Sequence, residues 1–196
     1  MIRVLIVDDH PALRRGLVAA LRYEPGFVTI GVAAGMAAAL VEAERSIPDV
    51  ALVDYQLADG DGLILCHELK LLPKAPGVLI YSAFARPELA MAAMVAGADA
   101  IVNKGAQLEE LFGAIRTVAR GGTALPRLRP GAVERDVARL EPEDLPILGL
   151  RMDGATLPEI ASVLRVDERD VSRRLTAMLG RLAAALDPGA MTRADG

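Results

Sequence analysis

Three carboxylates follow two short apolar stretches and could share one cation. Asp8 and Asp9 come directly after a run of four apolar residues, and Asp54 ends a second such run. If both runs are strands of one parallel sheet, their carboxyl ends meet at one edge and bring the acids together. Carboxylate oxygens suit Mg²⁺ with retained waters, and the backbone carbonyl of Gln56 could complete the ligand shell. A carboxylate beside Mg²⁺ can attack phosphorus and form an acyl phosphate, so the cluster could support phosphoryl transfer.

A hydroxyl and an amine end two further apolar runs. Ser82 follows one run, and Lys104 lies two residues beyond another. Phosphoryl transfer develops charge on oxygen, which a cation and a hydrogen-bond donor stabilise. Each residue alone also has a structural explanation, as a helix cap, a turn residue or a surface lysine. Four strand ends that all carry reactive groups favour one shared site.

Apolar runs alternate with amphipathic runs over about the first 120 residues. The expected strands cover residues 4–7, 28–32, 50–54, 77–81 and 100–102. The expected helices cover residues 11–23, 36–46, 62–72, 86–96 and 108–120. This alternation predicts an α/β fold with a parallel, doubly wound sheet. We interpret Cys66 and His67 as helix residues, and Asp59 and Asp61 as turn residues.

The remainder of the chain predicts a linker and a small all-α domain. Residues 123–139 are rich in proline and charge, and residues 140–186 form helical patterns separated by short turns. Thr156 and Asp167 are good helix N-caps, and the pattern matches a helix-turn-helix with its second helix at about 167–181. We expect residues 187–196 to be a frayed tail.

Composition restricts the class of protein. The chain is 53% hydrophobic but contains no apolar run of 18 residues, and its start does not resemble a signal peptide. One cysteine excludes an internal disulfide framework. A net charge of −4 and 3% aromatic residues provide no global attraction to nucleic acid or membrane. We expect a cytoplasmic protein without a membrane partner.

Four stretches together carry a resemblance to a known family. They are Val7-Asp8-Asp9-His10-Pro11, Val53-Asp54-Tyr55-Gln56-Leu57-Ala58-Asp59-Gly60-Asp61-Gly62, Tyr81-Ser82-Ala83, and Gly97-Ala98-Asp99-Ala100 leading to Lys104. Residues 1–122 resemble a bacterial response-regulator receiver domain, and the whole chain resembles the NarL/FixJ class with a LuxR-type helix-turn-helix at residues 140–186. The resemblance implies a flavodoxin-like sheet of order 2-1-3-4-5 and Mg²⁺-dependent phosphotransfer from a sensor histidine kinase to Asp54. It also implies slow self-dephosphorylation, homodimerisation on activation and regulation of transcription, without activity as a dedicated enzyme.

One departure concerns the conformational switch of the family. Its usual account couples rotation of the residue at Ser82 to inward movement of an aromatic side chain three residues before the lysine, and that position is Ile101 here. We therefore treat Ser82 and Ile101 as the switch pair, with coupling that is altered, weaker or absent.

A second set of departures concerns DNA recognition. Residues 139–186 hold seven arginines against eight acids, whereas phosphate contacts favour a positive patch. Asp170 adds an acid to the recognition helix, and Pro146 predicts a late start or a kink in the first helix of the domain. The candidate DNA contacts are Arg165, Arg169, Ser172, Arg173 and Arg174.

Two alternatives to a DNA-binding regulator follow from these departures. The C-terminal helices could bind a protein, which would make the chain a phospho-signalling adaptor. A Mg-aspartate phosphatase would need a second general acid and a substrate cap, and the sequence offers neither.

Overall fold

The computed structural model describes residues 1–83, 87–128 and 130–186. Contacts between residues divide the chain into two compact units. The first comprises Met1–Ala85 with Gly97–Leu125, and the second comprises Arg86–Ala96 with Pro126–Gly196.

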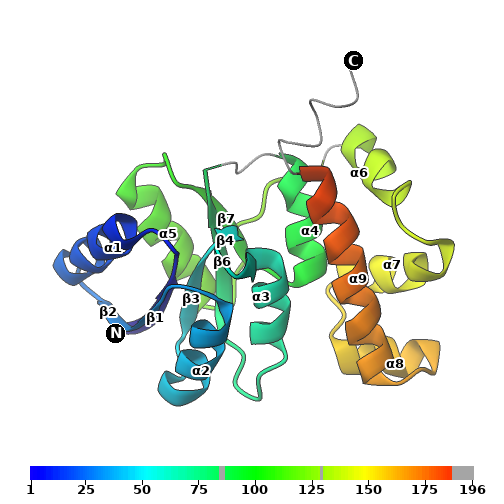
Figure 1. The fold of residues 1–196 in the computed structure, drawn as a ribbon, viewed down its shortest axis with the longest axis horizontal. Helices are drawn as coiled ribbons and strands as arrows, with labels where there is room; N and C mark the ends of the chain where they lie inside the picture. The colour runs from blue at the N-terminus through cyan, green and yellow to red at the C-terminus, as the bar shows by residue number, and fades with distance from the viewer. Residues whose placement is uncertain (84–86, 129, 187–196) are drawn as a thin grey trace. The chain divides into compact units, whose positions relative to one another are not determined.

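A five-stranded parallel sheet forms the centre of the first unit (Figure 1). Its strands are β1 (Ile2–Val7), β2 (Phe27–Ala33), β3 (Val50–Asp54), β6 (Gly77–Ser82) and β7 (Ala100–Asn103). The spatial order β2-β1-β3-β6-β7 confirms the predicted order 2-1-3-4-5. Every residue of β3 is buried, as expected for the central strand of a sheet covered on both faces.

Four helices of the first unit cover the two faces of this sheet. Figure 1 shows α1 (Pro11–Tyr23) and α5 (Leu108–Ala119) on one side, and α2 (Met36–Ser46) and α3 (Gly62–Lys70) on the other. Apolar residues spaced along one stripe of α1 and of α5 pack onto alternate residues of the strands. The side chains buried in this layer include Leu17, Leu21, Leu111, Ile115, Val4, Ile6, Leu52 and Leu79.

A small antiparallel hairpin follows the central strand, where the sequence indicated only turn residues. It pairs β4 (Gln56–Leu57) with β5 (Gly60–Asp61). Asp61 is the N-cap of α3 and accepts a hydrogen bond from the Leu63 amide at 2.6 Å. The hairpin therefore joins the end of β3 directly to the start of α3.

The second unit is helical. It contains α4 (Pro87–Ala96), α6 (Pro130–Val137), the 3₁₀ helix η1 (Pro142–Asp144), α7 (Leu145–Met152), α8 (Leu157–Leu164) and α9 (Glu168–Leu186). The order α7, α8, α9 matches the predicted all-α domain, and α8 and α9 form its helix-turn-helix.

Helix α4 packs against α6, α7 and α9, although its sequence position lies between β6 and β7. Its residues Leu89–Ala96 carry no charge and, apart from Met94, are buried. The Arg151 Nε of α7 donates a hydrogen bond to the Val95 carbonyl at 3.2 Å, which satisfies one of the free carbonyls at the end of α4. Residue 86, the expected first residue of this helix, lies outside the described residues.

The expected linker, residues 123–139, contains regular structure. Ala124 forms a parallel bridge with Ala100, donates its amide to the Asp99 carbonyl at 2.7 Å and accepts from the Ile101 amide at 3.2 Å. Strand β7 is an edge of the sheet, so its free backbone groups are available to the chain that leaves α5. Helix α6 then occupies Pro130–Val137, and the expected tail, residues 187–196, lies outside the described residues.

Helices α7, α8 and α9 begin where the sequence predicts. Pro146 lies in the first turn of α7, directly after η1, where no acceptor is needed for the missing amide. This confirms the expected late start. Thr156 and Glu159 form a capping box on α8, and the Asp167 carboxylate accepts from the Arg169 amide at 2.7 Å. Among the helices in the described part of the chain, none combines the length and apolar character that a membrane crossing needs.

Candidate functional site

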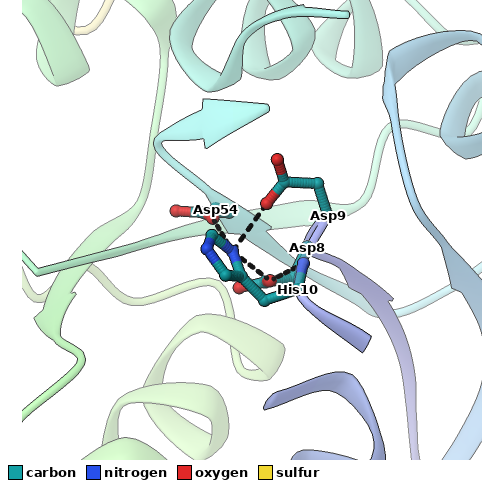
Figure 2. Close-up of side chains that lie close together, drawn as sticks. All are labelled: Asp8, Asp9, His10 and Asp54. Carbon is teal, nitrogen blue, oxygen red and sulfur yellow. Dashed lines mark hydrogen bonds and ion pairs between the residues drawn. The ribbon is translucent and has the colours of Figure 1, made fainter. Parts of the chain in front are cut away.

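The carboxyl ends of β1 and β3 bring the three predicted acids together. Val7 pairs with Val53, so the residues that follow, Asp8 and Asp54, are neighbours. Figure 2 shows Asp8, Asp9, His10 and Asp54 directed toward one another. One potential ligand atom from each of the four lies within 4.8 Å of the others. The predicted carboxylate cluster therefore exists, and His10 joins it.

Lys104 lies between two of these carboxylates. Its Nζ is 2.7 Å from Asp54 Oδ2 and 2.8 Å from Asp8 Oδ2. Strand β7 places it there, because the Lys104 amide donates to the Ser82 carbonyl at 2.9 Å, just past the last pair of the β6–β7 ladder. The predicted cation is thus in direct contact with the predicted phosphoacceptor.

Burial and ion pairing oppose each other at this site. Burial raises the pKa of Asp54, and its contacts with Lys104 offset part of that rise. Burial alone would lower the pKa of Lys104, but its hydrogen bonds to Asp54 and Asp8 raise it. Asp8 and Asp54 are only 1% and 4% exposed, so Lys104 is the main compensation for two buried negative charges.

The donor set fits a hard divalent cation. Three carboxylates face a single lysine, so negative charge remains after the Lys104 contacts. Asp9 Oδ1 is buried and accepts no hydrogen bond in the described part of the chain, although His10 Nδ1 lies 2.6 Å away. Oxygen-rich clusters of this kind suit Mg²⁺. The Gln56 amide lies 3.3 Å from Asp54 Oδ1, so the residue whose carbonyl is the predicted ligand follows the acid closely through its own amide.

The predicted switch pair lies on the two strands next to this site. Ser82 and Ile101 are 2% and 8% exposed. Ile101 pairs with Ile80, so by the alternation of strand side chains Ser82 and Ile101 share one face of the sheet. Tyr81 lies on the opposite face, where its hydroxyl donates to the Lys104 carbonyl at 3.3 Å.

Sequence reasoning assigned neither the site residues His10 and Arg14 nor the contact of Asp59, which lies in the hairpin after Asp54. His10 contacts the acids, and the Arg14 Nη1 donates to the Asp8 carbonyl at 2.5 Å. Asp59 accepts from the Met36 amide through both carboxylate oxygens. His10 directly follows Asp8 and Asp9 in the sequence, so its contact with the acids could have been predicted. Arg14 and Asp59 act across chain separations for which the sequence carries no signal.

The candidate DNA contacts on α9 divide into internal and exposed residues. Arg174 Nε donates to Asp144 Oδ1 at 2.8 Å, and Arg181 Nη1 donates to Asp144 Oδ2 at 3.0 Å. Asp144 is only 5% exposed, so Arg174 neutralises a buried acid of the same domain. The DNA contact of Arg174 stays a prediction, and its guanidinium also has a role within the fold.

The other candidates lie where a ligand could reach them. Arg169 and Arg173 are exposed, and Ser172 is half-buried. Arg173 pairs with Asp170 at 2.7 Å, the acid that departs from the usual pattern. Arg165 is the C-cap of α8 and has a left-handed conformation with φ of 56°. It lies in the turn of the helix-turn-helix and is exposed to solvent.

Comparisons with known proteins agree with this architecture. Residues 4–116 match the model of the response regulator receiver domain. The DNA-binding transcriptional activator DevR/DosR of Mycobacterium tuberculosis is 32% identical over 194 residues, covering 93% of this chain and 88% of the relative.

Two solved structures extend the comparison. The receiver domain of the putative response regulator NarL from M. tuberculosis is 32% identical, with a TM-score of 0.58, and covers 61% of this chain and 97% of that one. RcsB of Salmonella enterica bound to promoter rprA is 21% identical, with a TM-score of 0.60, over 94% of this chain and 100% of that one. At this identity the RcsB match supports the fold alone.

Proposed function

Because the chain belongs to the LuxR-type two-component response regulators, we propose that it accepts a phosphoryl group on Asp54 and thereby regulates transcription. The donor is a sensor histidine kinase, and the output is binding to double-stranded DNA, most effectively as a homodimer. The observation that carries the first half is the contact of Lys104 Nζ with both Asp54 and Asp8.

The residues of the site divide the chemistry among them. One Asp54 oxygen attacks phosphorus and forms an acyl phosphate as the phosphorus–nitrogen bond to the kinase histidine breaks. Slow attack by water later releases the group as inorganic phosphate and restores the carboxylate. Lys104 stabilises charge on the phosphoryl oxygens, and the Ser82 hydroxyl donates to them. Asp8, Asp9, Asp54 and the Gln56 carbonyl would hold Mg²⁺, which supplies further compensation for the phosphoryl charge.

Replacing the phosphoacceptor tests this assignment. Asp54→Asn removes the nucleophile with little change of shape, so labelling by acetyl phosphate with Mg²⁺ should disappear. Asp153→Asn, at an exposed acid that ends α7, is the control and should label like the wild type. Undiminished labelling of Asp54→Asn would show that another residue accepts the phosphoryl group.

DNA binding is supported by the helix-turn-helix and by the relative described as a DNA-binding activator. In this proposal α9 enters the major groove, and Arg165, Arg169 and Arg173 contact the duplex. Selection of fragments from host DNA, with full-length protein loaded with beryllofluoride and Mg²⁺, should enrich sites whose affinity falls steeply with salt. Asp54→Asn should enrich them less.

An adaptor function is the second candidate, and a specific observation favours it. Arg174 and Arg181 are held by Asp144, and Arg173 is paired with Asp170, which leaves few uncompensated positive charges on α9. If neither loaded nor unloaded protein enriches any DNA, the helices of the second unit become the surface to test for a protein partner.

A further inference from the structure

The N-terminus of α2 is capped by a residue from another part of the chain. Its N-cap, Gly35, has no side chain that could accept a hydrogen bond from the first free amides of the helix. The Asp59 carboxylate takes this role, and it accepts from the Met36 amide at 2.9 and 3.0 Å. Asp59 lies 23 residues beyond Met36 along the chain, in the turn between β4 and β5.

The contact leaves no room for a larger residue at the cap. A Cβ atom placed on Gly35 would lie 2.5 Å from both carboxylate oxygens of Asp59. The φ of Gly35 is −169°, an extended conformation open to any residue. Gly35 therefore provides the space that Asp59 fills.

The other end of the same hairpin fits equally closely against the phosphoacceptor. A Cβ atom on Gly62 would lie 2.1 Å from the Asp54 carbonyl oxygen, and the Gly62 amide donates to the Tyr55 carbonyl at 2.8 Å. The Gln56 amide faces Asp54 Oδ1 at 3.3 Å. The hairpin is thus held at its tip by α2 and at its base by the backbone of Asp54.

We infer that Asp59 is a positioning residue for the phosphorylation site, which holds the β4–β5 hairpin so that the Gln56 backbone stays beside Asp54. This inference rests on the proposed function, since the Gln56 carbonyl is a ligand of Mg²⁺ in that proposal. Without the Asp59 contact the tip of the hairpin can move, and the Gln56 carbonyl then no longer keeps a fixed position relative to the carboxylates. Residues that orient metal ligands in this way influence metal affinity without touching the metal.

The first test measures binding of Mg²⁺ alone to the full chain by calorimetry. Asp59→Ala should weaken binding roughly 10-fold, the lower end of the range for residues that orient ligands. Asp59→Asn loses the same charge but keeps an oxygen that can accept from the Met36 amide, so it should retain most of the affinity. Equal losses in both variants would mean that Asp59 acts only through its charge, and the inference would be wrong.

The second test breaks the same contact from the other side. Gly35→Ala keeps the charge of Asp59 but displaces its carboxylate, so it should weaken Mg²⁺ binding to a similar extent. In the double variant with Asp59→Ala the new methyl group has space, and the two losses should not add. Additive losses would indicate two independent effects and would contradict the inference.

A matched control and an independent readout separate positioning from general stability. Glu42→Gln removes one acid from α2 whose ion-pair partner within the described residues is Arg45 alone, and the Mg²⁺ affinity of this variant should equal that of the wild type. A purely structural role of Asp59 would lower the thermal midpoint and leave Mg²⁺ affinity unchanged, which would overturn the inference. If the wild type itself neither binds Mg²⁺ nor labels with acetyl phosphate, the proposed function fails before Asp59 is considered.

Discussion

At the scale of single residues, the main feature of the phosphorylation site is that it buries two carboxylates and one lysine together. Asp8 and Asp54 are nearly inaccessible to water, and Lys104 contacts both. The same lysine that would stabilise a phosphoryl group therefore also stabilises the site without one. Unfolding experiments with and without Mg²⁺ can measure how much Lys104 contributes to stability as the counter-charge of these two acids.

Lys104→Met should lower the free energy of unfolding by about 3 kcal/mol without Mg²⁺, because it leaves two buried carboxylates without their cation. Mg²⁺ should restore part of this loss by supplying positive charge to the same oxygens. Urea unfolding with and without Mg²⁺ measures both quantities. A variant as stable as the wild type in the absence of metal would contradict this view of Lys104.

Two neighbouring arginines on α9 differ in whether they stabilise a buried acid or lie exposed to solvent. Arg174 is paired with the buried Asp144, whereas Arg173 is exposed and paired with Asp170. Arg174→Ala should cost about 1.5–3 kcal/mol of stability because a buried acid loses a charged hydrogen bond. Arg173→Ala should change stability by no more than about 0.5 kcal/mol and should instead weaken binding to DNA.

Chemical denaturation and DNA titration of both variants test this division. The prediction is wrong if Arg173→Ala destabilises the protein as much as Arg174→Ala does. It is also wrong if Arg174→Ala folds normally and selectively loses affinity for DNA.

At the scale of elements, caps decide where the helices begin. The capping box on α8 joins the Thr156 amide and hydroxyl to the Glu159 carboxylate, each at 2.7 Å. The hydrogen bond from the Thr156 amide, followed by that from its hydroxyl, lowers the pKa of Glu159 below its ordinary value of 4.5.

A lowered pKa in the folded state has a defined effect on stability. The contribution of Glu159 is complete above its ordinary value of 4.5 and is lost as the pH falls through the lowered pKa. Glu159→Gln should therefore reduce the thermal midpoint at neutral pH and flatten its dependence on pH below 4.5. Thermal unfolding of wild type and variant across this range is the measurement, and parallel curves would contradict the assignment.

At the scale of the whole molecule, α4 belongs with the C-terminal helices by its contacts. An isolated receiver helix needs a polar face, but residues Leu89–Ala96 offer none. Packing against α6, α7 and α9, together with the bond from Arg151 to the Val95 carbonyl, accounts for this composition. The helix should therefore lose its protection together with the other helices of the second unit when that unit unfolds locally.

Native-state hydrogen exchange tests this expectation. Leu182→Ala removes a 2%-exposed side chain from α9 and should increase exchange in α4 together with α7 and α9. The amides of β3 and β6 should keep their protection. If α4 instead keeps protection with those strands, its association with the second unit does not persist in solution.

The sequence by itself determined the alternation of strands and helices, the strand-end acids, Ser82, Lys104 and the three helices of the C-terminal domain, whereas the family resemblance supplied the sheet order. These depend on local periodicity and on the rule that parallel strands end at one edge, both of which are present in the order of residues. The late start of α7 at Pro146 was predictable for the same reason, since proline acts on its own backbone.

Only the tertiary structure decided which charged groups meet across long stretches of chain. Arg174, a predicted DNA contact, also pairs with Asp144, 30 residues earlier in the chain, and no sequence pattern indicates that pair. The sequence around Asp59 indicates a turn residue, yet its carboxylate caps the helix that begins at Met36. The apolar sequence of α4 predicts that the helix is buried, but it does not predict which helices pack against it. Such pairings arise from how elements pack in space, and side-chain chemistry alone leaves many partners equally suitable.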